Sequence, residues 1–517
     1  MAIDRFLPLA PAAVLLLGAF LMQVVVPHLP PRGRLFSAPL LPLLVLPILA
    51  NRSFQSGRAD APTLLSGWGL DSALTLRADA FSLAFLILVV LLLFALVLAE
   101  GTAPSSASRR MALSFLLAAG ASLVFVAANG LMVGYALIVF DAIGALIWLI
   151  QERATAAIFR LLLSIVTTAA LTLYGLPADS TFTHLFLVLV YWLRLGLYPF
   201  LEAGILSSRK GGQQMLWFSL STTIGAYLVM RFPLVQPVPA AILWLVVVVM
   251  FLNGLVAWLS TRREVLLGRL FLTQMLWIML VAPVPALVAV GLTLALTTAL
   301  AAMWLVPPPG RPNLGERNWP WLYATPALAT LSIVGLPFTL GWMAYSQLYA
   351  RLAGDGLSAM LGVITLAEGL ALAALLNYWR DLLGQPETND LASAAGLIVA
   401  APFLVPGLSL VALQALIGQA VNTRFDWPTP VLLMVGAGWA WAALLSYGHG
   451  RWLLRLPLSE RQIVGILEIT WTMRPIIDGL DQAARLILRL RLVLEGEHYL
   501  GWAILIALTG IIVLLLS

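Results

Sequence analysis

Apolar runs of about twenty residues recur from one end of the chain to the other, separated by short polar breaks. An α-helix of about 20 residues is long enough to cross the hydrocarbon core of a bilayer. The runs therefore predict an all-α polytopic bundle of about 14–16 membrane crossings and no soluble domain of any size. The expected crossings are 6–26, 36–50, 80–99, 111–128, 130–150, 155–175, 184–204, 214–231, 239–259, 264–281, 284–305, 322–346, 358–377, 392–413, 430–447 and 500–516.

Composition supports a chain that is solvated by lipid. Hydrophobic residues make up 61% of the 517 residues and charged residues only 10%, whereas about a quarter of a soluble domain is charged. The net charge of +6 does not indicate nucleic-acid binding, because the arginines are scattered through short loops. The absence of cysteine excludes disulfides, thiolate metal sites and cysteine nucleophiles, and we expect no metal site.

The positions of lysine and arginine test this topology. Alternating crossings place nineteen of them on one side and seven on the other, and Arg160, Arg194 and Arg269 remain within crossings. The positive-inside rule then places both termini outside. We expect a multi-pass protein of a bacterial plasma membrane, in contact with the lipid bilayer.

One segment near the carboxyl end does not have the pattern of a crossing. Residues 457–499 mix charged and apolar residues at three- and four-residue steps, which predicts an amphipathic surface helix kinked at Pro475. Two interpretations stay open. The helix is either an ordinary juxtamembrane helix at the lipid interface, or a lateral strap that crosses neighbouring subunits.

Charged residues inside apolar runs are costly in lipid and are therefore functional candidates. The four that we single out are Asp141, Arg194, Glu202 and Glu368. A carboxylate at this depth needs a cation partner, and we expect Arg194 to be the partner of Asp141. The pair either fixes the register of two helices or belongs to a proton or ion path.

Two crossings contain helix breakers in similar strings. Gly196 and Pro199 interrupt one crossing, and Gly335 and Pro337 interrupt another, five crossings further on. A proline inside a crossing kinks the helix and frees a carbonyl. An odd offset means opposite orientation in the membrane, and broken helices in inverted repeats indicate a transporter core.

These features predict a division of the chain into six parts. They are N-terminal helices at 1–110, a first inverted repeat at 111–232, a second at 233–380, C-terminal helices at 381–456, the amphipathic helix at 457–499 and a final crossing at 500–517.

The order and spacing of these residues resemble the antiporter-like, proton-conducting subunits of respiratory complex I. The same fold occurs in Mrp-type cation/proton antiporters and membrane-bound hydrogenases. The segment from Arg77 to Ser82 resembles the opening of that family's third helix, Asp141 lies at its fifth-helix glutamate, and Arg194 at its seventh-helix lysine. Segments 226–232, 262–269 and 331–341 resemble the end of the eighth helix, the entry to the tenth and the broken twelfth.

The resemblance covers crossings three to thirteen. It implies an ion-translocating subunit that assembles with other membrane subunits and holds no cofactor of its own.

The chain departs from that family where the family carries protons on lysines. Lys210 is the only lysine and lies in a predicted loop, and Arg194 cannot load and release a proton because arginine stays charged. The eighth-helix lysine position is Thr223, and the ionisable position after the twelfth-helix break is Tyr345. None of the four histidines replaces the central relay.

Three functions stay open. The chain conducts protons or Na⁺ through a modified or degenerate half-channel, it is a structural scaffold with an inactive channel, or it is a stand-alone secondary transporter. Without cysteine, a central histidine pair or a glycine-rich nucleotide loop, no redox site is expected in the chain itself. Whether the chain belongs to an enzyme depends on its partner subunits.

Overall fold

A computed structural model describes most of the first three quarters of the chain. The described residues are 7–50, 58–60, 75–77, 79–100, 106–150, 154–174, 181–195, 212–233, 238–260, 263–280, 286–305, 319–335 and 358–384, with positions 345, 349, 437–439, 441–443, 445, 479 and 482. Glu202, Gly196, Pro199, Pro337, the final crossing and all but two positions of 457–499 lie outside them.

Helices form at the expected crossings throughout this part of the chain. In the first half they are η1 (Leu7–Leu9), α2 (Ala10–Val24), η2 (Val26–His28), α3 (Pro31–Leu43), α4 (Leu46–Ala50), α6 (Ala80–Glu100), α7 (Ser106–Val126), α8 (Gly130–Ile150), α9 (Ala154–Tyr174), α10 (Thr181–Arg194) and α12 (Gly212–Arg231). In the second half they are α13 (Ala240–Leu259), α14 (Arg263–Met275), α15 (Trp277–Leu280), α16 (Ala286–Leu305), α17 (Trp319–Val334) and α19 (Ser358–Gly384).

Two expected crossings are each divided into two helices. The crossing expected at 36–50 is shared by α3 and α4, and the one at 264–281 by α14 and α15. A two-stranded antiparallel hairpin, β1 (Arg58–Asp60) with β2 (Thr75–Arg77), is added to the all-helical bundle. Leu76 of β2 also bridges Ala127 just after α7, so the hairpin lies at an end of the bundle.

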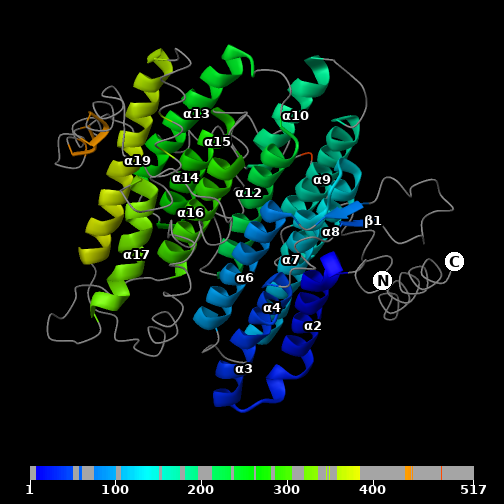
Figure 1. The fold of residues 1–517 in the computed structure, drawn as a ribbon. Helices are drawn as coiled ribbons and strands as arrows, with labels where there is room; N and C mark the ends of the chain where they lie inside the picture. Colours follow the sequence, from blue (N-terminus) through cyan, green and yellow to red (C-terminus); the bar gives the residue numbers. More distant parts are fainter. Residues whose placement is uncertain are drawn as a thin grey trace.

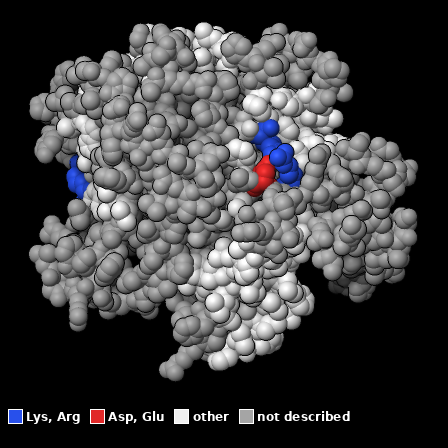
Figure 2. Space-filling model, in the orientation of Figure 1, with Lys and Arg blue, Asp and Glu red and all other residues white. Residues whose placement is uncertain are grey.

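The protein is a multi-pass membrane protein. Within the described part, six helices are long and apolar enough to cross a membrane. Large apolar side chains such as Phe20 and Ile165 are more than half exposed, which suits contact with lipid. On the face drawn in Figure 2, the described surface is nearly all uncharged.

Contacts between helix ends agree with the expected alternation of crossings. Asp79 at the start of α6 and Arg231 at the end of α12 were expected on one side, and their Oδ2 and Nη1 atoms are 2.5 Å apart. Arg263 at the start of α14 and Trp304 near the end of α16 were expected on the other side. The Arg263 guanidinium donates to the Trp304 carbonyl oxygen at 3.2 Å.

The helices that carry the candidate residues pack in a continuous series. Helix α8 packs on α9, α9 on α10, α10 on α12, α12 on α16, α16 on α14, and α14 on α19. Figure 1 shows α8 and α9 toward one side of the bundle and α17 and α19 at the other, with α12 and α16 between them. The candidate residues therefore lie in one series of neighbouring helices.

Gly335, one of the helix breakers named from the sequence, directly follows the end of a helix. Helix α17 ends at Val334, and Gly335 has φ +71° with its N–H bonded to the Ser332 carbonyl at 3.1 Å. A left-handed glycine directly after a helix is a common way to end it, because glycine adopts positive φ without a steric penalty.

Candidate ion-pathway site

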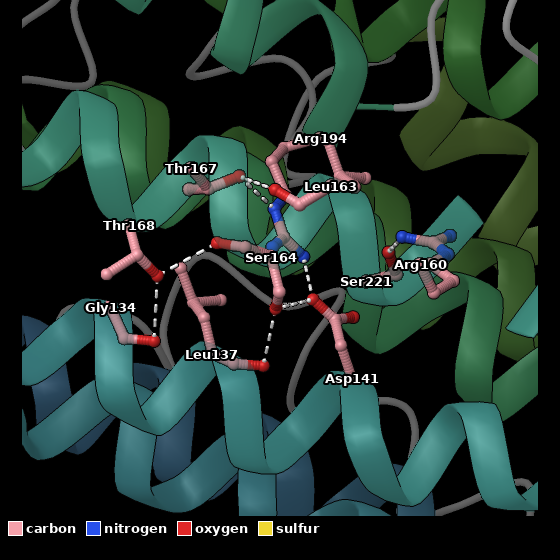
Figure 3. A network of polar contacts seen from close by, with 10 residues as sticks. All are labelled: Gly134, Leu137, Asp141, Arg160, Leu163, Ser164, Thr167, Thr168, Arg194 and Ser221. Carbon is pink, nitrogen blue, oxygen red and sulfur yellow. Dashed lines mark hydrogen bonds and ion pairs between the residues drawn. The ribbon is translucent and has the colours of Figure 1, made fainter. Parts of the chain in front are cut away.

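Asp141 and Arg194 form a buried ion pair across two helices. Asp141 lies in the middle of α8 and Arg194 is the last residue of α10. Arg194 Nη1 is 2.5 Å from Asp141 Oδ2, and the two side chains are 1% and 0% exposed. The pairing expected from the sequence is thus present, and Figure 3 shows the two groups facing each other from separate helices.

Helix α9 supplies the hydroxyl groups that orient this pair. Arg194 Nε donates to Thr167 Oγ1 at 2.8 Å, and its Nη2 donates to Ser164 Oγ at 3.3 Å. Ser164 Oγ is in turn 2.6 Å from Asp141 Oδ2, to which it donates. Three helices therefore hold one guanidinium in place, which suits the planar fork of arginine. Sequence reasoning did not single out either hydroxyl, because a serine or threonine in a crossing costs little free energy compared with a charged residue.

A second buried arginine, Arg160, lies beside the same carboxylate. It is 4% exposed, its Nη1 donates to Ser221 Oγ at 2.8 Å, and its guanidinium carbon lies 5.0 Å from the centre of the Trp217 ring. Figure 3 draws Asp141 with both arginines beside it. Because both guanidinium groups stay charged, neither can hand a proton on.

Thr223 occupies the centre of the helix series. Its hydroxyl is 3.2 Å from that of Thr297 on α16, and both side chains are fully buried. The pair is neutral and can exchange hydrogen bonds, but it cannot hold a charge. Further along, Arg269 Nη1 on α14 donates to Asn253 Oδ1 on α13 at 2.9 Å, also in the buried core.

Glu368 on α19 belongs to a second cluster, whose hydrogen-bonding partners are neutral. Gln274 Nε2 donates to Glu368 Oε2 at 2.7 Å, and Trp277 Nε1 donates to Oε1 at 2.7 Å. The Tyr345 hydroxyl donates to Gln274 Oε1 at 2.5 Å. Gln274 thus joins Glu368 to Tyr345, two residues that the sequence singled out separately.

A cavity adjoins this second cluster at the break after α17. Gly335, Tyr345, Thr365 and Glu368 are among its lining residues, and it is large enough to hold water. The glycine is required by the packing, because a Cβ atom at Gly335 would lie 2.7 Å from Cδ2 of Tyr345. The helix break therefore makes room for the tyrosine beside the carboxylate.

The two carboxylates differ in their charged neighbours. Asp141 lies within hydrogen-bonding distance of a guanidinium. Within the described ranges, no arginine, lysine or histidine lies within ion-pair distance of Glu368, and its hydrogen bonds come from an amide and an indole. Asp141 is thus tied to a permanent cation, whereas Glu368 is free to exchange a proton without breaking an ion pair.

A third charged group joins α6 to α12 at one end of the bundle. Asp79 caps α6, because its Oδ1 accepts hydrogen bonds from the N–H and the hydroxyl of Ser82, both at 2.9 Å. Its Oδ2 faces Arg231 at 2.5 Å and Arg77 at 3.7 Å. Burial alone would raise the pKa of Asp79, but the bonds from Ser82 and the Arg231 charge together hold it below its ordinary value.

Comparisons with known proteins identify the fold. Neither family profiles nor curated protein sequences match the chain. Among solved structures, it is similar to a chain of the membrane-bound sulfane sulfur reductase, an archaeal respiratory membrane complex. The TM-score is 0.66 and the identity 14%, over 97% of this chain and 99% of that chain.

Two further structures have the same fold. A chain of the Mrp complex from a Dietzia species gives a TM-score of 0.59 and 15% identity, over 86% of this chain and 98% of that chain. A chain of respiratory complex I from Thermus thermophilus gives 0.60 and 18%, over 86% and 99%. The predicted fold of the antiporter-like membrane subunits is thereby confirmed, and at these identities the likeness concerns the fold alone.

Proposed function

We propose that this chain is a membrane subunit of a larger ion-translocating complex, and that it conducts protons along a modified path in which Glu368 takes up and releases the proton. The similar chains come from a respiratory membrane complex, an Mrp complex and respiratory complex I, and each is covered over 98% or more of its length. That coverage supports a subunit of the same kind.

The observation that carries the proposal is the environment of Glu368. Among the described residues, its carboxyl group is bound by neutral donors alone, and it adjoins a cavity large enough to hold water. A membrane carboxyl group in such surroundings can change its charge without leaving a buried cation unpaired. It can therefore take up and release a proton, as the membrane lysines do in the family that the chain resembles. The only lysine of this chain is Lys210.

Polar contacts between successive helices support a path that leads toward this carboxyl group. Thr223 on α12 contacts Thr297 on α16, and Gln274 on α14 contacts Glu368 on α19. Hydroxyl groups and water between them can relay protons. The Asp141–Arg194 pair lies at the opposite end of the series, and in this proposal it is structural.

The test is proton flux in liposomes that contain the purified complex. Glu368→Gln keeps the hydrogen-bonding shape but cannot ionise, and we expect a loss on the order of 100-fold, as for removal of a positioned proton carrier. Asp141→Asn should leave flux near the wild-type rate. Glu264→Gln, which changes a carboxylate in the first turn of α14, is the matched control.

Each outcome separates the open functions. Wild-type flux in Glu368→Gln, with the complex intact, would contradict the proposal and leave a scaffold role. A loss confined to Asp141→Asn would move the path to the first cluster. Full transport by the isolated chain would instead support a stand-alone transporter. Repeating the flux measurement with a Na⁺ gradient in place of the pH gradient shows whether the coupling ion is H⁺ or Na⁺.

A further inference from the structure

The cavity beside Glu368 has a feature that proton transfer does not require. Tyr345, Tyr349 and Trp439 all line it. Trp277 packs edge-on against both tyrosines, with ring centres 6.0 Å and 4.9 Å away. Three aromatic side chains therefore line the cavity beside one carboxylate, and a fourth, Trp277, donates to that carboxylate from behind the two tyrosines.

A carboxylate beside several aromatic rings favours the binding of an organic cation. Aromatic rings attract cations electrostatically through their faces, and clusters of them recognise ammonium groups. A carboxylate adds a full negative charge and free lone pairs. Glu368 keeps lone pairs available, because each of its oxygens accepts one N–H while a carboxylate offers about four acceptor positions in total.

The same surroundings are poor for a metal ion. Hard cations such as Ca²⁺ take six to eight oxygen ligands, and no cluster of three metal-ligating side chains occurs among the residues that the structure describes. Of the other lining hydroxyls, Thr365 Oγ1 donates to the Leu361 carbonyl at 2.8 Å. An ammonium ion needs only a few acceptors and aromatic faces.

We propose that this cavity binds a small ammonium ion, ammonium itself or methylammonium, in competition with the proton at Glu368. The inference rests on the same carboxylate as the proposed proton path, but it concerns a different ligand. Ammonium salts should therefore inhibit proton flux through the complex, whereas sodium salts should not.

The test is modification of the intact complex by dicyclohexylcarbodiimide, which reacts with protonated carboxyl groups in apolar sites. Mass spectrometry of the Glu368 peptide gives the labelling rate. We expect labelling without added cation, and protection of about fivefold or more by methylammonium. Sodium chloride at equal concentration should not protect. Equal labelling with and without methylammonium, or equal protection by sodium, would overturn the inference.

A second variant examines the aromatic wall separately. Trp439 is 39% exposed, so Trp439→Leu should fold, label normally and lose about fivefold in methylammonium protection. If Glu368 does not label under any condition, the bulky reagent does not reach this carboxyl group. The ammonium inference is then decided by thermal stability: methylammonium should raise the Tm of the wild type but not of Glu368→Gln, and equal shifts would overturn it.

Discussion

Gly225 of α12 lies directly against the backbone of Arg194 at the end of α10. A Cβ atom on Gly225 would be 2.9 Å from the Arg194 carbonyl carbon and 2.9 Å from the Leu195 nitrogen. Because these are backbone atoms, no side-chain rotation can relieve the contact. The absence of a side chain at position 225 thus fixes the position from which Arg194 reaches Asp141.

Gly225→Ala should therefore separate the two helices and loosen the buried ion pair. We expect the free energy of unfolding to fall by about 1–3 kcal/mol, the usual cost of overpacking, measured by thermal denaturation in detergent. Gly362→Ala is the control, since a Cβ there meets nothing within 4 Å. In a helix it should be neutral or stabilising by up to about 1 kcal/mol. Equal stability of the two variants would contradict this account of the packing.

Arg194→Lys should make proton flux depend on Asp141. A lysine keeps the positive charge but, unlike arginine, can lose its proton when it is buried. In the wild-type background Asp141→Asn should leave flux nearly unchanged, whereas in the Arg194→Lys background it should lower flux several-fold. A double-mutant cycle of liposome flux measures this coupling. If the two positions show no coupling, the permanent charge of Arg194 is not what keeps Asp141 from taking part in proton flux.

Asp79→Asn should weaken the protein in a pH-dependent way. The pKa of Asp79 in the folded protein is below its ordinary value of 3.8, so its ionised form stabilises the fold above about pH 4. That contribution is lost as pH falls through the folded pKa. Asparagine also caps helices, so the substitution removes mainly the charge.

At pH 7 the loss for Asp79→Asn should be about 2 kcal/mol, between the values for exposed and buried pairs. Thermal unfolding of both proteins at several pH values measures the difference, which should shrink below pH 4. A difference that is constant with pH would show that the ion pair with Arg231 contributes nothing.

The helices were predictable because a backbone polar group without a hydrogen bond is very costly in lipid. A long apolar run that crosses the bilayer satisfies all its backbone groups by forming an α-helix. The Asp141–Arg194 pair was predictable for a related reason, since a buried charge needs a partner. Helix α17 ends directly before Gly335, which the sequence offered as a helix breaker, whereas Pro337 lies outside the described residues. The hairpin of β1 and β2 was missed, because strands of three residues are too short to show the alternation of apolar and polar residues that identifies a strand.

The contacts of the second cluster, around Glu368, could not be predicted from the sequence. Gln274 and Trp277 lie in an apolar stretch, and neither residue type signals a partner 90 residues away. Which side chains meet depends on the rotation of α14 and α15 against α19, and hydrophobicity leaves that rotation undetermined when every face is apolar. Ser164 and Thr167 were missed because hydroxyl side chains are common in crossings, although both contact Arg194.

The contact between Asp79 and Arg231 has a consequence for how the protein is made. The two residues are 152 positions apart, so α6 leaves the ribosome long before its partner on α12 has been synthesised. During that interval the Asp79 carboxylate lacks this partner. The contact between α6 and α12 therefore forms late in synthesis, and a chain truncated before Arg231 should be a preferred substrate for membrane proteases.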